Sequence, residues 1–142
     1  MFMKPDQVLY TASATAENGR DGRVMSDDGH LDLIANAPPE LGGSGAGTNP
    51  EQLFAAGFSS CFQSAMGVVA RMEKKDISGS TVTASVGLGR TDDGMYELRV
   101  EIVARVPSLD KDEARELVEK ANQVCPYSRA TRGNIEVVLS VA

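Results

Sequence analysis

The sequence predicts a single domain with an α+β fold over residues 1–142. Several short segments alternate apolar and polar residues, as strands with one buried face do. Residues 52–70 (QLFAAGFSSCFQSAMGVVA) form a long uncharged run, which predicts a core helix. Apolar residues at helical spacing in 114–124 predict a second, amphipathic helix. The resulting order is strands, buried helix, strand pair, amphipathic helix and strand, which indicates an α+β architecture.

The N-terminal third is expected to form three strands. Alternation in residues 7–15 (QVLYTASAT) predicts a half-buried strand, and residues 18–23 (NGRDGR) predict a turn. A short strand at 23–26 completes a hairpin. After a second turn at residues 27–29 (DDG), a third strand is predicted at 31–35 (LDLIA).

A proline- and glycine-rich loop, residues 36–49, leads into the uncharged helix. Asn49 is expected to cap that helix, with Pro50 at its first position and Glu51 in its first turn. The helix is predicted to run from residue 50 to about residue 74. Its polar residues, such as Gln52 and Gln63, favour a core helix over a membrane span. Because one small sheet and one helix cannot cover it, we expect a dimer that buries it.

The C-terminal half is predicted to hold a hairpin, a helix and a last strand. The hairpin joins strands at 81–90 and 95–106 through the turn at 92–94 (DDG). Ser108 or Asp110 is expected to cap the helix, and a last strand is predicted at 134–141. The apolar face of the helix is expected to carry Ala114, Leu117, Val118, Ala121 and Val124. The inward side chains of the last strand are expected to be Ile135, Val137, Leu139 and Val141.

Composition and charge exclude several classes of function. The net charge of −6 argues against binding to nucleic acid or to anionic membranes, both of which need a basic face. The N-terminus (MFMKPDQ) lacks an apolar signal-peptide core, so a cytoplasmic location is expected. In the cytoplasm, a transient catalytic or sensing disulfide is favoured over a permanent one.

The two cysteines, Cys61 and Cys125, are the most informative residues. They lie 64 residues apart, which is far from the clustered spacing of metal ligands. They form either a redox couple or a structural bridge, and Cys61 alone also fits a small buried hydrophobic residue. Because Cys125 precedes Pro126, where helices stop, we expect it on a breakable edge rather than in a rigid core.

A reactive Cys61 needs an activating group. It lies roughly 16 Å along its helix from Pro50, too far for the helix dipole to act. His30, the only histidine, follows a turn that is expected to be exposed, so a Cys–His pair is a weak alternative. The remaining candidates are arginines in turns or loops, among which the sequence alone does not choose: Arg20, Arg23, Arg129 and Arg132. The glycine-rich loop lacks the Gly-Lys-Ser/Thr ending of a phosphate-binding loop.

Three motifs together resemble the organic hydroperoxide resistance (Ohr) proteins of the OsmC/Ohr superfamily. Residues 47–62 (GTNPEQLFAAGFSSCF) resemble one Ohr signature, and residues 124–135 (VCPYSRATRGNI) resemble the second. Residues 18–22 (NGRDG) resemble the loop that carries the family's active-site arginine. The likeness covers essentially the whole chain, and Phe58 stands where many relatives carry tyrosine.

The resemblance implies a thiol peroxidase without metal or prosthetic group, in an OsmC-like fold whose antiparallel sheets pack around a long buried helix in an intertwined homodimer. Cys61 would be oxidised to a sulfenic acid, and Cys125 would resolve it as a disulfide. Arg20 would stabilise the thiolate, and Glu51 would hold Arg20. The implied substrates are organic hydroperoxides, and the implied reductants are dihydrolipoyl groups on lipoylated proteins.

Two further expectations concern the site. An apolar substrate pocket is expected from Phe54, Phe58, Phe62, Met66 and Tyr127, although ordinary core packing also explains most of them. Glu51 and Cys61 lie about 15 Å apart on a straight helix, so we expect a composite site in which one protomer supplies Cys61 and the other Glu51, together with Arg20. The alternatives are an OsmC-type peroxidase with other substrates, and a non-enzymatic apolar-ligand carrier or redox sensor.

Overall fold

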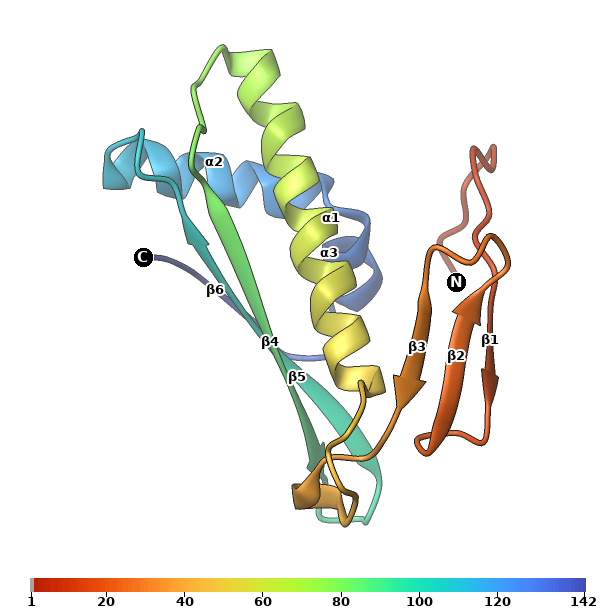
Figure 1. Cartoon of the computed structure of the whole chain (residues 1–142). Helices are drawn as coiled ribbons and strands as arrows, with labels where there is room; N and C mark the ends of the chain where they lie inside the picture. The colour runs from red at the N-terminus through yellow and green to blue at the C-terminus, as the bar shows by residue number, and fades with distance from the viewer. Residues whose placement is uncertain (1) are drawn as a thin grey trace. The chain divides into compact units, whose positions relative to one another are not determined.

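In the computed structural model, which describes residues 2–142, the chain forms two compact units. The N-terminal unit ends at Pro50, and the C-terminal unit is Glu51–Ala142. Each unit contains a three-stranded sheet, and all the α-helices belong to the second (Figure 1). The predicted α+β class is confirmed.

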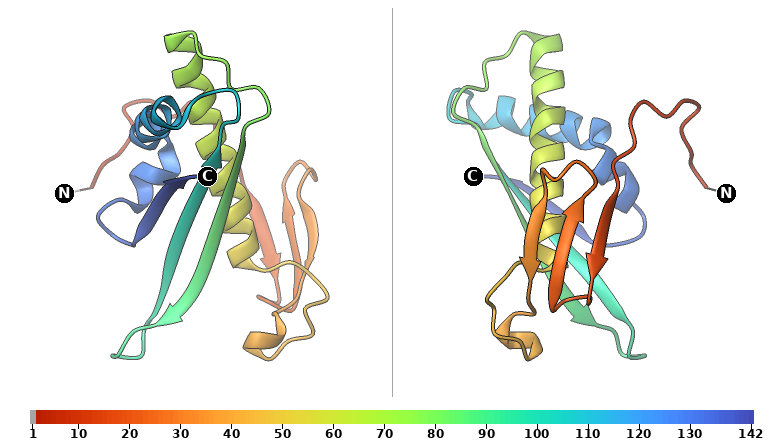
Figure 2. Two further views of the ribbon diagram at one scale, coloured as in Figure 1. Left: turned by 90° about the vertical axis from the view of Figure 1, so that its left-hand side faces the viewer. Right: turned by 45° about the vertical axis from the view of Figure 1, so that its right-hand side comes forward.

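The N-terminal unit is an antiparallel meander in the order β1 (Ala14–Glu17), β2 (Gly22–Ser26) and β3 (Asp32–Ala35) (Figure 2). The first turn uses Asn18 and Gly19, whose φ angles of 58° and 57° are left-handed. Gly22 is required because a Cβ there would lie 2.0 Å from the carbonyl oxygen of Glu17.

The strand predicted at residues 7–15 is mostly wrong, because β1 begins only at Ala14. Its partner β2 ends at Ser26, which pairs with Ala14, and the chain then turns away at residues 27–29. Residues 7–12 therefore have no strand of this unit to pair with. Their apolar side chains are exposed rather than half-buried: Val8 by 66%, Leu9 by 87% and Tyr10 by 78%.

The predicted loop at residues 36–49 contains one short 3₁₀ helix, η1 (Pro39–Leu41). Asn36 organises the loop: its side-chain oxygen accepts hydrogen bonds from the backbone N–H groups of Ser44 and Gly45, both at 3.0 Å. Its side-chain nitrogen donates to Asp21 Oδ1 at 2.8 Å. The loop is thereby tied to the turn that carries Arg20.

Helix α1 spans Pro50–Glu73, close to the predicted bounds, and belongs to the C-terminal unit from Glu51 onward. The sheet follows in the order β4 (Thr81–Arg90), β5 (Tyr96–Arg105) and β6 (Val137–Val141). Between β5 and β6 lie α2 (Lys111–Val124) and α3 (Pro126–Thr131), and α2 crosses α1 steeply (Figures 1 and 2). Asp110 is the α2 cap, since its side chain accepts a hydrogen bond from the Glu113 N–H at 2.8 Å.

The core lies on one face of this sheet, because the register brings alternate apolar residues together. Val86 pairs with Val100, which in turn pairs with Val137, and the neighbouring rows repeat the pattern. This face packs against α1 and α2. The buried residues of α1 are Phe58, Phe62, Ala65, Met66, Val69 and Ala70.

Three expectations for the C-terminal unit need correction. The sheet is mixed rather than antiparallel, because β6 runs parallel to β5. The last strand begins at Val137 instead of residue 134, since α3 and a turn at Gly133 (φ 79°) occupy the preceding residues. Val124 is 46% exposed, and Cys125 takes the buried place at the end of the α2 face.

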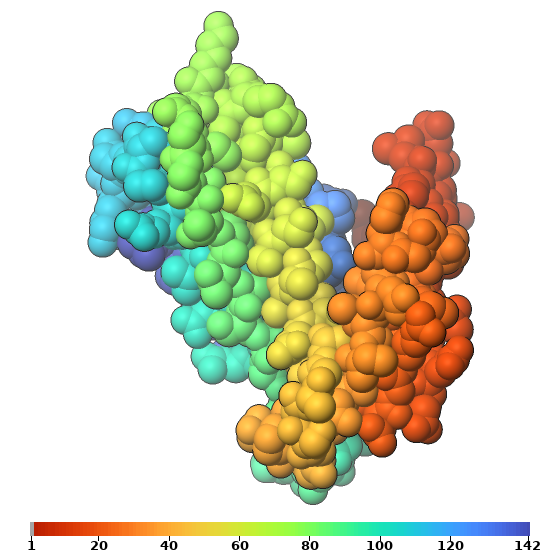
Figure 3. Space-filling view, viewed as in Figure 1, coloured from red at the N-terminus to blue at the C-terminus, as the bar shows by residue number. Residues whose placement is uncertain are grey.

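Helix α1 is buried along one side only. Figure 3 shows its other side at the surface, beside β4. By length and composition alone, an 18-residue window of α1 could cross a membrane, and 33% of that window is buried within the chain. The packing of Phe58, Phe62 and Met66 against the sheet nevertheless agrees with the predicted core helix.

Candidate active site

The two cysteines, 64 residues apart in sequence, lie together in the C-terminal unit. The thiol of Cys125 donates a hydrogen bond to Cys61 Sγ, with the sulfurs 3.7 Å apart, and both cysteines are free. A disulfide bond is about 2.05 Å long, so a closing movement of roughly 1.6 Å would join them.

Cys125 connects two helices. Its N–H donates to the Ala121 carbonyl at 2.8 Å, which closes α2, and its carbonyl accepts from the Arg129 N–H at 3.0 Å in α3. Pro126 follows as the first residue of α3, where a missing N–H has no cost. Cys125 is fully buried in the core, so the expected edge position is wrong: the chain breaks its helix here without leaving the core.

Cys61 is the more accessible of the two, because it is only partly buried. Burial nevertheless raises the pKa of its thiol above the usual value. The backbone N–H of Tyr127 acts in the opposite direction, and the adjacent Cys125 thiol adds to the increase. The net effect of burial, the Tyr127 N–H and the Cys125 thiol is to favour the neutral thiol of Cys61. Formation of the Cys61 thiolate would therefore be helped by a nearby positive charge.

Three aromatic rings form a cluster beside the thiols. The ring centroids of Phe54, Phe58 and Tyr127 lie 6.2, 6.1 and 5.6 Å apart, within the range of favourable aromatic pairs. Phe54 is partly buried and Tyr127 is 37% exposed, so these two keep accessible ring surface.

The other predicted pocket residues lie deeper. Phe58, Phe62 and Met66 are all 0% exposed and belong to the hydrophobic core. Core packing accounts for them in this structure, and their contact with a substrate stays a prediction.

Gly57 is a site residue that sequence reasoning missed. It lies one helical turn before Cys61, and a Cβ at this position would approach Tyr127 Oη to 2.5 Å and its Cζ to 3.1 Å. The absence of a side chain therefore lets the Tyr127 ring lie on α1. The available signal was a glycine inside a helix, which costs about 1 kcal/mol relative to alanine and calls for a packing reason.

The charged residues predicted for the site, Arg20 and Glu51, lie in other segments of the sequence than the two cysteines. Arg20 lies in the β1–β2 turn of the N-terminal unit, and Glu51 lies in the first turn of α1. Their pairing with each other and with Cys61 stays a prediction. His30 is 91% exposed in its side chain and contacts Asp28 Oδ2 at 3.1 Å.

Within residues 2–142, no group of three or more His, Cys, Asp or Glu side chains is arranged to hold a metal ion. The chemistry that this arrangement can perform with its own groups is that of two adjacent thiols, one accessible and one buried, beside an aromatic surface.

Comparison with known proteins gives one consistent result. Residues 42–140 match the family model described as OsmC-like protein. The organic hydroperoxide resistance protein of Xanthomonas axonopodis pv. citri is 52% identical over 140 residues, covering 97% of this chain and 98% of that protein. Protein OhrB of Bacillus subtilis, an organic hydroperoxide resistance protein, is 42% identical over 134 residues, covering 94% of this chain and 98% of that protein.

Solved structures agree. A putative organic hydroperoxide resistance protein from Vibrio cholerae, with captopril bound in one of its active sites, has a TM-score of 0.92 at 47% identity, covering 97% of this chain and 95% of that one. The crystal structure of Bacillus subtilis OhrB has a TM-score of 0.86 at 42% identity, covering 95% and 100% of the two chains.

Proposed function

This chain belongs to the organic hydroperoxide resistance proteins of the OsmC/Ohr superfamily, and from that premise we propose that it is a thiol-dependent peroxidase that reduces organic hydroperoxides to alcohols. The observation that carries the proposal is the pair of free thiols 3.7 Å apart. A cell would use such an enzyme in its response to oxidative stress.

The proposed reaction has two oxidation steps. The Cys61 thiolate attacks the terminal oxygen of the hydroperoxide, the O–O bond breaks, and the alkoxide leaves as the alcohol after taking a proton. Cys61 is then a sulfenic acid. The Cys125 sulfur attacks it, releases water and forms the Cys61–Cys125 disulfide.

The enzyme returns to its starting state through an external dithiol. A dihydrolipoyl group on a lipoylated protein would attack the disulfide, supply two electrons and leave as lipoyl disulfide. This cycle needs no metal or bound cofactor. The proposed location is the cytoplasm, where the compartment keeps resting thiols reduced.

The different exposures of the two cysteines support their assigned roles. Cys61 is partly accessible and can meet a substrate, whereas Cys125 is fully buried and has Cys61 Sγ within 3.7 Å, so its assigned partner in the reaction is the oxidised Cys61. Phe54 and Tyr127 would offer apolar surface to the organic part of the substrate, which favours alkyl hydroperoxides over hydrogen peroxide.

The proposed source of positive charge is Arg20, held by Glu51. Burial raises the pKa of Cys61, so a permanently charged guanidinium is needed to favour the thiolate. Because Glu51 and Cys61 are about 15 Å apart along α1, we propose that the partner subunit's Arg20 and the partner subunit's Glu51 complete each site.

The exposure of the N-terminal sheet in the single chain supports a homodimer. Among residues 2–50 of the N-terminal unit, only Ala35 and Asn49 are buried, and all four β1 residues are exposed. A three-stranded sheet needs an apolar face packed against another layer. A sedimentation mass equal to the single 15.0 kDa chain at micromolar concentration would contradict the dimer.

Mixed dimers test the composite site. When Cys61→Ser and Glu51→Ala chains are combined, one site of each heterodimer keeps both residues, so part of the activity should return. A mixture that stays inactive would refute the composite arrangement.

The function itself is tested by consumption of cumene hydroperoxide with dihydrolipoamide as reductant. The wild type should turn over many times and Cys61→Ser not at all. If the wild type consumes at most one peroxide per thiol pair with any dithiol, the protein is a carrier or sensor and the peroxidase proposal fails.

A further inference from the structure

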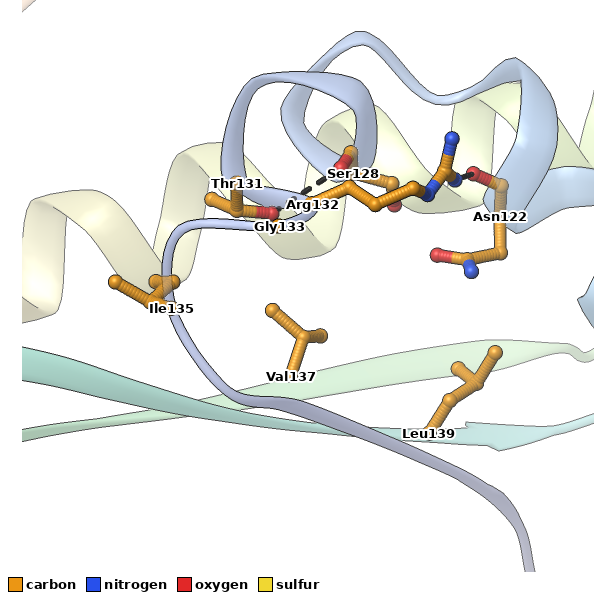
Figure 4. Close-up of a pocket in the computed structure, with 8 residues that line it drawn as sticks. All are labelled: Asn122, Ser128, Thr131, Arg132, Gly133, Ile135, Val137 and Leu139. Carbon is orange, nitrogen blue, oxygen red and sulfur yellow. Dashed lines mark hydrogen bonds between the residues drawn. The ribbon is translucent and has the colours of Figure 1, made fainter.

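A cavity lies in the C-terminal unit, between the end of α2, α3 and β6. Its volume is about 230 Å³. Figure 4 shows polar side chains from the two helices on one side and apolar side chains from β6 and the segment before it on the other. Eight residues line the cavity: Asn122, Ser128, Thr131, Arg132, Gly133, Ile135, Val137 and Leu139. Neither cysteine and none of the three clustered rings is among them.

Ser128 is the unusual group in this lining. It is 3% exposed, and its Oγ is buried without a hydrogen-bond partner. A buried hydroxyl usually has a partner, because leaving it unpaired costs the free energy of its lost hydration. Thr131, by contrast, donates its hydroxyl to the carbonyl of Tyr127 at 2.9 Å. Because Ser128 also lines the cavity, a small movement of its side chain would let a bound molecule supply the missing partner.

Two further polar groups lie on the same side. The Arg132 guanidinium donates one hydrogen bond to the Asn122 carbonyl at 2.7 Å, which holds it beside the cavity. The side-chain amide of Asn122 projects into the cavity (Figure 4). Arg132 is the only charged residue in the lining. Together, a cation, an amide and a hydroxyl match the hydrogen-bonding needs of a carboxylate.

The opposite side is apolar. Val137 and Leu139 are inward residues of β6, and Ile135 lies just before the strand. A ligand that fits both sides has an anionic head and a short aliphatic tail. One water occupies about 30 Å³ in the liquid, so the cavity has room for roughly eight non-hydrogen atoms. A straight-chain carboxylate of about six carbons has that size.

The geometry points to a binding site for short-chain aliphatic monocarboxylates in this cavity, with the carboxylate on Arg132, Asn122 and Ser128 and the tail on Ile135, Val137 and Leu139. The inference stands apart from the proposed peroxidase, since it uses none of the residues assigned to that reaction. The site shares α3 with Tyr127, and Cys125 is the residue that precedes this helix, so an occupant would pack against the helix next to the thiols.

The test is a titration of the wild-type protein with sodium hexanoate, followed by the methyl NMR signals of Ile135, Val137 and Leu139. These signals should shift and saturate. Acetate, which has the head alone, and 1-hexanol, which has the tail alone, should both bind more weakly than hexanoate.

Matched variants identify the head-group contacts. Arg132→Gln should weaken hexanoate binding about tenfold or more, the usual effect of losing a charge-assisted hydrogen bond. Arg129→Gln makes the same charge change on the exposed surface of α3, outside the lining, and should leave binding unchanged. Ser128→Ala should fold normally, because it removes an unpartnered hydroxyl, and should bind more weakly.

Three outcomes would overturn the inference. The first is the absence of saturable shifts at these methyl groups. The second is equal weakening by Arg132→Gln and Arg129→Gln. The third is hexanoate shifting the Phe54 and Tyr127 signals instead, which would place the ligand at the thiol site.

Discussion

Gly57→Ala tests whether the packing of Tyr127 against α1 influences the pKa of the Cys61 thiol. The new Cβ would lie 2.5 Å from Tyr127 Oη and 3.1 Å from its Cζ, closer than the 3.5 Å or more of a relaxed contact. The tyrosine tip must therefore retreat by about 1 Å. The Tyr127 N–H, which lowers the pKa of Cys61, should move with it.

Gly67→Ala is the matched control on the same helix. Its Cβ would meet only Arg71 Nη1, at an ordinary 3.6 Å. Both variants gain about 1 kcal/mol of helix propensity. Overpacking destabilises Gly57→Ala alone, by about 1–3 kcal/mol. The difference in the free energy of unfolding between the two variants should therefore be about 1–3 kcal/mol in urea denaturation.

The site itself is assayed by the alkylation rate of Cys61 against pH, in a Cys125→Ser background that leaves one thiol. Gly57→Ala should shift the profile to higher pH, and Gly67→Ala should not. Adding Tyr127→Phe to Gly57→Ala removes the atom in closest contact, so the pH profile should return part of the way to that of the parent protein. Identical profiles and identical unfolding for the two alanine variants would refute the reasoning.

Three other predictions follow from the packing and the charges. Phe62→Ala should lower the free energy of unfolding by about 3–5 kcal/mol in urea, because Phe62 is fully buried. Asp110→Ala should lower it by about 1 kcal/mol, since the α2 cap on Glu113 is lost; an unchanged midpoint would contradict this. The Arg23 hydrogen bond lowers the pKa of Asp32, so their ion pair stabilises at neutral pH and is lost as the pH falls through that pKa. Arg23→Gln should raise the pKa of Asp32 in an NMR titration of its carboxyl carbon, and an unmoved pKa would exclude this cause.

The main boundaries of the C-terminal unit were predictable because their signals are local. The sequence Asn49-Pro50 predicts the start of α1, and the turn at residues 92–94 predicts the β4–β5 hairpin. In each case the signal and the structure lie within a few residues of one another. Residues 7–15 show the limit of such signals, since alternation indicates a strand but does not supply its partner.

Contacts between distant segments of the C-terminal unit could not be predicted from local signals. The parallel pairing of β6 with β5 depends on where α2 and α3 return the chain. The burial of Cys125 depends on α2 and α3 meeting inside the core rather than at an edge. The proline after Cys125 predicts only the end of a helix.

The sequence by itself determined the α+β class, the main helices and the central hairpin, and its motifs singled out Cys61 and Cys125. Only the tertiary structure decided that the two sulfurs lie 3.7 Å apart, that Tyr127 rests on Gly57, and that Ser128 faces a cavity. The physical reason is the distance along the sequence over which each kind of interaction acts. Propensity, capping and turn chemistry act between near neighbours in sequence, whereas these contacts join α1, α2, α3 and β6 and exist only when the whole core has packed.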